Sequence, residues 1–576
     1  MCIRDSCRPT DVFEPVQIRL DLSHPETQTI AVSIEWTPQT QRQTFQLPVW
    51  TPGSYTVRDH AQHLHSLQLL ANGEELPVRR MAPHQWLCDL PDLSPLTLNY
   101  QLEARDLTVR TGLLDPDFAS LCLAAVAMDI DGCRWSPHHV AVTAPEHWSV
   151  HLPLEPSAEG WVAADFDALV DSPLHAGPFQ AEPFMVEGKT HELLLIGTPP
   201  MGWPPNFISD IEKVCSATCR LLGTPPPAGD RYQLVLQLLD QGYGGLEHDH
   251  SAVLQFSWSA LAKPKGYRQL LQLIGHEYLH QWNVRRLRPV ELRPYDYGQA
   301  VITEGLWFAE GITSYFDLSL PLLAGCSDRP TLLRDLGEEL SSVLMSPGCS
   351  IQSLAASARE AWIKLYKATP ASRDSQISYY RLGAAVAFCL DVRLRQRGHS
   401  MAAILRELWQ GPGRQARGYS RDHIKAAVAR WDRDLASDLD QWLDQPEAVP
   451  LLDCVKALGL RMDPVPLKHP DHGLTLKDAE GAALIQRVRR DSPGQQAGLV
   501  VGDELLAING YRVRRSSDLA VLLEKQECVR VTYSRRSLLK ETQLFPDAGV
   551  DHWTLDWDPG CTTEQRQLRD RWFEIV

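Results

Sequence analysis

The sequence predicts a multidomain α+β protein, and two changes of pattern along its 576 residues indicate this fold class. The first third alternates apolar and polar residues with a period of two, which is typical of strands that bury one face. From about residue 187, strands alternate with amphipathic helical segments, and a long helical region follows. A chain of this length corresponds to three or four domains of roughly 150 residues each.

The region 13–183 is predicted to form an antiparallel β-sandwich, because short alternating strands are separated by turn residues. The turn WTPGSY (50–55) is expected to be a structural corner that Pro52 and Gly53 bend, with contact to a functional site as the alternative. The predicted strands cover 15–23, 28–36, 43–50, 97–105 and 139–144.

The region 187–446 is predicted to form an α/β domain with a helical C-terminal part. A loop, GYGGLEH (242–248), follows the second predicted strand, and its glycines let the backbone approach a ligand closely. Gly383 and the alanines after it predict close packing of one helix against another. The predicted elements are strands 192–197 and 231–240 and helices 207–222, 331–345, 380–398, 401–411 and 421–431.

The stretch LIGHEYLHQWN (273–283) contains the pattern HExxH, which carries the strongest chemical signal in the chain. On a helix, His276 and His280 are four residues apart and lie on one face, so that both imidazoles can bind one zinc ion. Glu277 is placed to accept a proton from the attacking water. The alternative is a chance match on a surface helix, because the pattern is short.

A catalytic zinc site needs a third protein ligand and one open position. The segment TEGLWFAEGITSYFDLSL (303–320) supplies two acidic candidates, Glu304 and Glu310. Glu310 is preferred because it lies in a run of aromatic and small residues that is predicted to be buried. A metal would remove the cost of burying its carboxylate. Two histidines and a glutamate from a separate downstream helix predict a thermolysin-like zinc site.

Several stretches resemble the glycyl aminopeptidase family of zinc peptidases, whose members carry a C-terminal PDZ domain. HEYLHQWN (276–283), RRLRP (285–289) and LWFAEGITSYF (306–316) carry the resemblance, and LPVWTPGSYTVRD, GYGGLEH and SYYRLG add to it. It implies a zinc-dependent aminopeptidase that removes glycine or alanine from peptides with a free N-terminus. Two rival hypotheses are a PDZ-guided zinc endopeptidase and a non-catalytic PDZ adaptor.

The resemblance also implies how the substrate's N-terminus is held. In the related aminopeptidase N family, a similar glycine-rich segment that ends in a glutamate binds the free α-amine of the substrate. Here that glutamate is Glu247, and a carboxylate at a fixed distance from zinc would select a charged amine. Gly244 and Gly245 are expected to line the substrate site, and an ordinary turn with an exposed Glu247 is the alternative.

A second role comes from the same relatives, in which a tyrosine of a Tyr-x-Lys-Gly pattern donates a hydrogen bond to the tetrahedral intermediate. YRLG (380–383) aligns with this pattern, so the resemblance implies that Tyr380 is the oxyanion donor. Leu382 stands where the lysine would be, and Tyr379 is the alternative donor.

The region 451–546 resembles a PDZ domain through GAALIQRVRRDSPGQQAGLVVGDELLAINGYRV (481–513). Gly473 and Leu474 lie where PDZ domains carry their carboxylate-binding loop, which implies that a peptide C-terminus binds there by strand addition. His472 stands where an apolar residue is common, and a spacer that binds nothing is the alternative. The tail 547–576 is expected to pack back on the body through its tryptophans.

Composition excludes other classes of function. The net charge of −16, without a basic stripe, argues against nucleic acid as a partner, and no apolar run is long enough to span a membrane. Thirteen cysteines without metal or disulfide spacing favour a reducing compartment. The first ten residues, MCIRDSCRPT, contain no apolar core of a signal peptide, so the sequence as read predicts a cytoplasmic protein. If the natural start is missing, an export signal could be missing with it.

Overall fold

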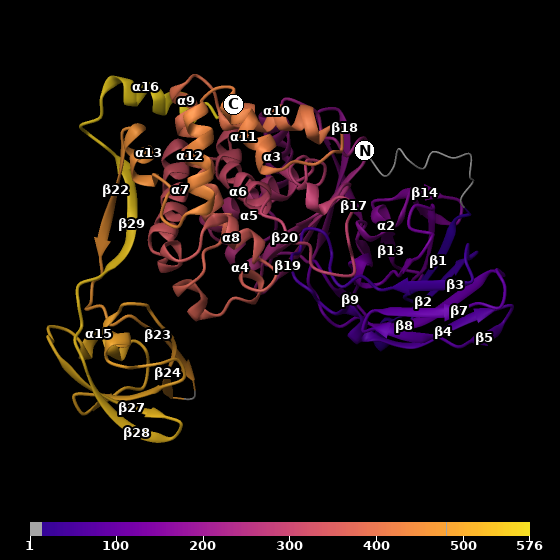
Figure 1. Cartoon of the computed structure of the whole chain (residues 1–576), viewed down its shortest axis with the longest axis horizontal. Coiled ribbons are helices and arrows are strands. Elements are labelled where there is room, and N and C mark those ends of the chain that lie inside the picture. The colour runs from indigo at the N-terminus through magenta and orange to yellow at the C-terminus, as the bar shows by residue number, and fades with distance from the viewer. Residues whose placement is uncertain (1–13, 480, 576) are drawn as a thin grey trace.

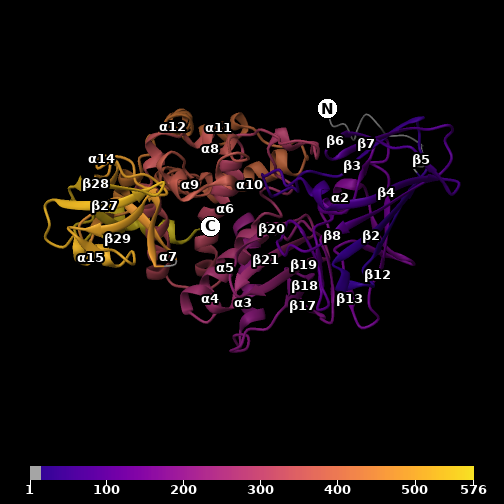
Figure 2. The same ribbon diagram turned by 90° about the horizontal axis from the view of Figure 1, so that it is seen from below.

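The computed structural model describes residues 14–479 and 481–575, and it divides into three regions that follow one another along the chain (Figure 1). Figure 2 shows the sheets of the first region and the small third region at opposite ends, with the helices of the second between them. The expectation drawn from MCIRDSCRPT lies outside the described residues. Within the described residues, no helix is both long and apolar enough to cross a membrane.

The first region is built on an eight-stranded sheet and two four-stranded sheets. Buried and less buried residues alternate along its central strands, which confirms the period-two prediction. The large sheet is not purely antiparallel as predicted, because β1 and β12 run parallel. In spatial order its strands are β14 (Glu155–Ser157), β15 (Gly160–Ala163), β12 (His138–Thr143), β1 (Val16–Asp21), β2 (Thr29–Trp36), β8 (Leu96–Glu103), β4 (Leu64–Ala71) and β5 (Glu74–Leu76). The smaller sheets contain β13 (Ser149–His151), β16 (Leu174–Gly177), β10 (Ala119–Leu121) and β9 (Gly112–Leu114), and β11 (Asp129–Ile130), β3 (Arg42–Gln46), β7 (Gln85–Asp89) and β6 (Arg79–Ala82).

The WTPGSY turn leaves the first region and lies against the second. The strand predicted over 43–50 ends at Gln46, because the residues that follow pair with a segment far along the chain. The backbone N–H of Val49 donates to the carbonyl of Tyr297 over 2.9 Å, and Trp50 Nε1 donates to the carbonyl of Asp296 over 2.7 Å. The corner is therefore held at the junction of the two regions.

The second region contains a five-stranded mixed sheet with β20 at its edge. Strands β18, β19 and β21 run parallel, whereas β17 and β20 run antiparallel to their neighbours. GYGGLEH was expected to be a loop, and this was wrong: most of it forms β20, and Gly245 of this strand packs against Glu277 on α5 (Pro264–Leu279). The bounds are β17 (Ala181–Val186), β18 (Lys189–Ile196), β19 (Tyr232–Leu239), β21 (Ser251–Ser257) and β20 (Tyr243–Glu247).

Helices pack on this sheet and on one another, and one close crossing positions the site. Gly311 on α6 and Gly383 on α9 face each other, and a Cβ on either would collide with the backbone of the other. The predicted close packing of small residues is therefore present. The main helices are α3 (Phe207–Leu222), α5 (Pro264–Leu279), α6 (Leu306–Leu323), α7 (Arg329–Leu344), α8 (Leu354–Arg359), α9 (Tyr379–Gln396), α10 (Met401–Leu408), α11 (Arg421–Ala429), α12 (Arg433–Asp444) and α13 (Leu451–Ala457). Short helices are α2 (Phe166–Val170) and α4 (Trp258–Leu261).

The third region has its own hydrophobic core and joins the body through the ribbon β22–β29. Its small sheet begins at β23, whereas α13 and β22, which the sequence grouped with it, pack into the core of the body. Arg487 also ties it to the second region, because its guanidinium donates to both carboxylate oxygens of Asp374 over 2.8 and 2.9 Å. The elements are β22 (Leu460–Pro466), β23 (Leu474–Ala479), β24 (Ala482–Val488), α14 (Pro493–Gln496), β25 (Glu504–Ile508), β26 (Tyr511–Arg512), α15 (Asp518–Leu522), β27 (Val529–Arg535), β28 (Leu538–Leu544) and β29 (Val550–Trp557).

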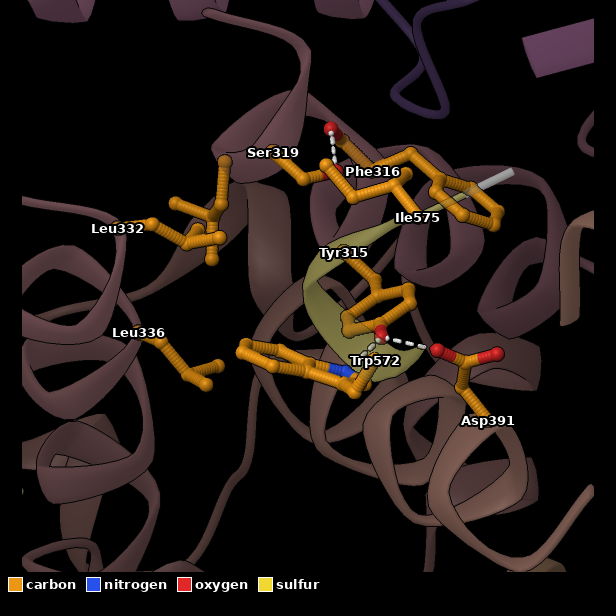
Figure 3. A pocket seen from close by; sticks show the side chains of 9 residues that line it. Tyr315, Phe316, Ser319, Leu332, Leu336, Asp391, Trp572 and Ile575 are labelled. Carbon is orange, nitrogen blue, oxygen red and sulfur yellow. Dashed lines mark hydrogen bonds between the residues drawn. The ribbon is translucent and has the colours of Figure 1, made fainter. Parts of the chain in front are cut away.

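The C-terminal helix α16 (Thr563–Phe573) returns to the body, and Figure 3 shows how it is anchored. Trp572 Nε1 donates to the hydroxyl of Tyr315 over 2.9 Å, and that hydroxyl donates to Asp391 Oδ2 over 2.7 Å. Tyr315 lies on α6 and Asp391 on α9. The tail therefore fastens together the two helices that meet at the glycine crossing.

Candidate active site

The structure brings together the two histidines of HExxH and Glu310. Nε2 of His276 and Nε2 of His280 lie 3.5 and 3.3 Å from Oε2 of Glu310. His276 lies in the last turn of α5, His280 caps that helix, and Glu310 projects from α6. Glu304, the competing candidate, instead forms an ion pair with Arg421 away from the histidines. Three ligand atoms from two helices thus converge on one point.

The other ring nitrogen of each histidine is already bonded, which leaves Nε2 as the free ligand atom. His276 Nδ1 lies 2.8 Å from Oδ2 of Asp317, and His280 Nδ1 donates to the carbonyl of Asn283 over 2.6 Å. The side chain of Asn283 in turn donates to the carbonyls of Phe308 and Ala309 on α6. Such partners fix the orientation of metal-binding histidines.

These residues fit a zinc ion. The donor atoms of His276, His280 and Glu310 all lie within 4.8 Å of one another, and Oε2 of Glu310 is buried with no hydrogen-bond partner. A buried carboxylate oxygen without a partner is costly, and a cation removes that cost. Two imidazoles and one carboxylate also match the ligand set of catalytic zinc sites, which keep a fourth position open.

Asp317 is expected to set the affinity of the site for its metal. Replacing it by asparagine removes the negative charge that holds His276 Nδ1–H, and we expect zinc to bind about 10- to 100-fold more weakly. Competition with a coloured chelator measures this constant. Asp328→Asn is the matched control, since Asp328 caps the distant end of α7. An Asp317→Asn protein that binds zinc as tightly as the unchanged protein would contradict the assigned role.

Glu277 lies beside His280 and packs against β20. A Cβ at Gly245 would collide with the Glu277 carboxylate, so only glycine leaves room for that side chain. One carboxylate oxygen of Glu277 is buried without a hydrogen-bond partner. Gly245 therefore supports the position of Glu277, and Gly244 lies next to it on the cavity wall.

Burial and the neighbouring histidines shift the pKa values of Glu277 and Glu310 in opposite directions. Burial raises the pKa of Glu277, and this outweighs the opposing positive charge of the two histidines. Burial acts in the same direction on Glu310, but the positive charge of His280, together with the nearness of His276, lowers its pKa overall. Glu310 is thus suited to remain a carboxylate, whereas Glu277 is suited to exchange a proton near neutral pH.

Glu247 is buried at the end of β20, close to the same cluster. Ligand atoms of Glu247, Glu277 and His280 all lie within 4.8 Å of one another, and Oε1 of Glu247 has no hydrogen-bond partner. Gly53 of the WTPGSY turn packs on it, since a Cβ there would lie 2.6 Å from Glu247 Oε2. The turn is therefore more than a structural corner: it forms part of the cavity wall.

Two adjacent tyrosines at the start of α9 take different positions. Tyr380 lines the cavity and its ring stacks near that of His276, with centroids 6.4 Å apart. Tyr379 is fully buried behind it and does not line the cavity. The hydroxyl of Tyr366 lies 3.0 Å from that of Tyr380 and 3.3 Å from that of Tyr379. Burial raises the pKa of Tyr380, which favours its protonated, hydrogen-donating form.

One cavity of about 320 Å³ lies between the first and second regions, and it is lined by Glu247, His276, Glu277, His280, Glu310 and Tyr380. The first region contributes Gly53 and Arg110 to its wall, and the second region contributes residues of β20, α5, α6, α7 and α9. A largely buried network of charged and polar side chains holds the segment after Glu247 in place. Its members are Asp171, His248, Asp249 and Arg285, joined by contacts of 2.7 to 3.0 Å.

Sequence reasoning missed several groups around the site. Asp317 follows Glu310 by seven residues, so it lies on the same face of α6, and this spacing could have indicated it. Arg110 lies in a turn and Tyr366 in a three-residue 3-10 helix, and neither segment has a pattern that would indicate a site. Arg285, in the segment RRLRP, is fully buried and forms ion pairs with Asp171 and Asp249.

In the third region, the residues expected to bind a peptide carboxylate have occupied backbone donors. The N–H of Gly473 donates to Asp471 Oδ1 over 2.9 Å, and the N–H of Leu474 donates to His472 Nδ1 over 3.0 Å. A carboxylate could accept these two hydrogen bonds only after the side chains had moved. The outer edge of β23, next to them, has no partner strand within the described sheet.

A cluster from HExxH and a second helix that fits a zinc ion, with a buried glutamate of raised pKa beside it, is the arrangement of a thermolysin-like metallopeptidase. Family models agree with this class. Residues 17–178 match the peptidase M61 N-terminal domain, residues 269–386 match M61 glycyl aminopeptidase, and residues 484–535 match a PDZ domain. These matches confirm the resemblance to the glycyl aminopeptidase family with a C-terminal PDZ domain, and the protein is a metallopeptidase.

Solved structures extend the comparison to the whole chain. An aminopeptidase N family protein from Idiomarina loihiensis aligns with a TM-score of 0.88 and 27% identity, over 97% of this chain and 100% of that one. An M1 zinc metallopeptidase from Deinococcus radiodurans aligns with a TM-score of 0.48 and 14% identity, over 77% of this chain and 95% of that one. No curated protein sequence matches the chain.

Proposed function

We propose that the protein is a zinc aminopeptidase that removes a small N-terminal residue, glycine or alanine, from peptides. The observation that carries the proposal is the position of Glu247. Its buried carboxylate, with an unpartnered oxygen, lies beside Glu277 and His280. An ammonium group is the substrate feature that would satisfy a second buried carboxylate at this distance from the metal ligands.

His276, His280 and Glu310 would hold the metal. When bound, zinc supplies a Lewis acid that polarises the peptide carbonyl and lowers the pKa of water. Glu277 then takes a proton from the attacking water and delivers it to the leaving amine. Its raised pKa supports this exchange, because a group that must both accept and donate a proton works best when its pKa is near the working pH.

Tyr380 would stabilise the oxyanion of the tetrahedral intermediate. Its hydroxyl is next to that of Tyr366, and its ring lies beside His276, one of the residues that would hold the metal. A donor held in place before the reaction stabilises charge that develops in the transition state. Tyr379 is not proposed for this role, because it lies behind Tyr380 and away from the cavity.

Backbone groups of β20 would align the peptide. β20 is an edge strand, and because residues 244 and 245 are glycines, no side chain projects from it next to Glu277. An extended substrate could therefore lie along this strand with its N-terminus at Glu247.

The preference for glycine or alanine rests on the match to the glycyl aminopeptidase model. The PDZ domain is proposed to take a peptide C-terminus, subject to movement of Asp471 and His472.

The test replaces Glu247 by glutamine, which keeps the shape of the side chain and removes its charge. We expect kcat/KM for alanine p-nitroanilide to fall about 10- to 100-fold, because this factor corresponds to the free energy of a hydrogen bond to a charged group. Most of the loss should appear as a higher KM. Glu192→Gln, on β18 of the same sheet and away from the cavity, is the matched control.

Adding N-acetylated alanine p-nitroanilide to the same experiment separates the rival functions. An endopeptidase would cleave N-acetylated peptides and would be indifferent to the charge at Glu247. A non-catalytic PDZ adaptor would cleave neither free nor blocked substrates and would contain little zinc. An unchanged kcat/KM in the Glu247→Gln protein would refute the assignment of the amine site.

A further inference from the structure

Arg110 is the charged residue by which the first region reaches the active-site cavity. It lies in the segment between β8 and β9 and lines the cavity together with Gly53. Its Nη2 donates to the carbonyl of Gly245 over 3.1 Å. Gly245 is the glycine that packs on Glu277, so the guanidinium lies next to the strand on which the substrate is proposed to lie.

Among the residues that the structure describes, no acidic side chain comes within ion-pair distance of Arg110. Its Nε is buried and has no hydrogen-bond partner. Arg381, on the same cavity wall, differs in this respect because its Nε lies 3.7 Å from Oε2 of Glu339. A partly buried guanidinium without a counter-ion is costly, and one that borders a substrate cavity is suited to bind a carboxylate there.

Arg58 strengthens this interpretation. It follows the WTPGSY turn, donates to Ser54 Oγ over 3.3 Å, and its Nε is also buried without a hydrogen-bond partner. Burial lowers the pKa of Arg58, and the positive charge of Arg110 lowers it further. Two arginines of the first region thus stand close enough to repel each other, with no carboxylate paired to either within the described chain. Their mutual repulsion favours an anion at this wall.

We propose that Arg110 binds a carboxylate of the substrate on the C-terminal side of the cleaved bond. This inference rests on the proposed aminopeptidase function. Gly245 and Glu247 are two residues apart on β20, which corresponds to about 6.6 Å along a strand. A peptide whose ammonium is at Glu247 and whose cleaved bond is near Glu277 would bring its second or third residue toward Arg110.

Two sources supply a carboxylate at that distance: the C-terminus of a di- or tripeptide, and the side chain of an acidic residue just after the cleaved bond. The first would make the enzyme selective for short peptides. The second would make it selective for sequence. A bidentate hydrogen bond from the guanidinium suits both, so the chemistry is shared and only the substrate series distinguishes them.

The experiment measures kcat/KM on three peptides: Ala-Ala-Ala with a free C-terminus, the same peptide amidated, and amidated Ala-Asp-Ala. The unchanged enzyme is expected to prefer one of the two carboxylate-bearing peptides to the amidated Ala-Ala-Ala by about 10- to 100-fold. In Arg110→Gln that ratio should fall to about 1, and Arg110→Lys should keep part of it because the positive charge remains. Arg105→Gln, an exposed arginine of the same region, should keep the full ratio.

Preference for the free C-terminus assigns short peptides as substrates, and preference for the aspartate peptide assigns an acidic second residue. Equal rates on all three peptides in the unchanged enzyme would overturn the inference, as would a ratio that survives in Arg110→Gln. Alanine p-nitroanilide, which has no carboxylate, separates this failure from that of the proposed function. If the unchanged enzyme cleaves it, only the role of Arg110 is lost.

Discussion

Replacing Glu277 by glutamine is expected to lower kcat on alanine p-nitroanilide by about 10²- to 10⁴-fold. Glutamine keeps the shape of the side chain in its place against Gly245, but it cannot take a proton from the attacking water or return one to the leaving amine. The zinc ligands are untouched, so zinc content should stay at the level of the unchanged protein.

Zinc analysis of the purified variant is therefore the control for this result. Glu192→Gln provides a second control, because it makes the same chemical change on β18, away from the cavity. A Glu277→Gln protein that retains zinc and more than a tenth of the normal kcat would rule out Glu277 as the general base.

Replacing Tyr380 by phenylalanine is expected to lower kcat by about 10²- to 10³-fold with little change in KM. The ring remains stacked near His276, while the hydroxyl that would donate to the oxyanion is lost. Because this hydrogen bond forms mainly in the transition state, its loss should appear in kcat rather than in binding of the substrate.

Tyr379→Phe is the matched comparison, since the two hydroxyls share the partner Tyr366 and differ in access to the cavity. We expect the Tyr379 variant to lose much less activity. A larger loss of kcat in Tyr379→Phe than in Tyr380→Phe would transfer the oxyanion role to Tyr379 and would contradict the assignment of Tyr380.

Local patterns in the sequence predicted the parts of the site that lie on one element. HExxH sets two ligands on one helical face by spacing alone, and the apolar run around Glu310 indicates that this acid is buried. Helix α3 was predicted to the residue, because its apolar periodicity and its breaks are strong, whereas the helix predicted over 401–411 ends at Leu408. The small residues at the start of α9 likewise predicted the close crossing that brings Tyr380 toward Glu310.

Contacts between distant segments could not be predicted in this way. Gly53 packs on Glu247 although nearly two hundred residues separate them, and nothing local in WTPGSY indicates that partner. Arg110 reaches the cavity for the same reason. β20 was predicted as a loop because its glycines suggest a turn, but the strand forms where those glycines make room for Glu277.

The boundaries of the third region show the same limit. α13 and β22 are short and amphipathic, so the sequence does not indicate which core receives them. The structure places them against the body, where they meet the returning C-terminal helix. Only the part from β23 to β28 forms the independent core that matches a PDZ domain.

The most direct test of the central claim is hydrolysis of glycine and alanine p-nitroanilide, compared with their N-acetylated forms, by protein whose zinc content is known. We predict cleavage of the free-amine substrates only, about one zinc ion per chain, and loss of activity when a chelator removes the metal. Equal cleavage of the acetylated substrates would contradict the aminopeptidase assignment, and full activity in zinc-free protein would contradict the metal centre.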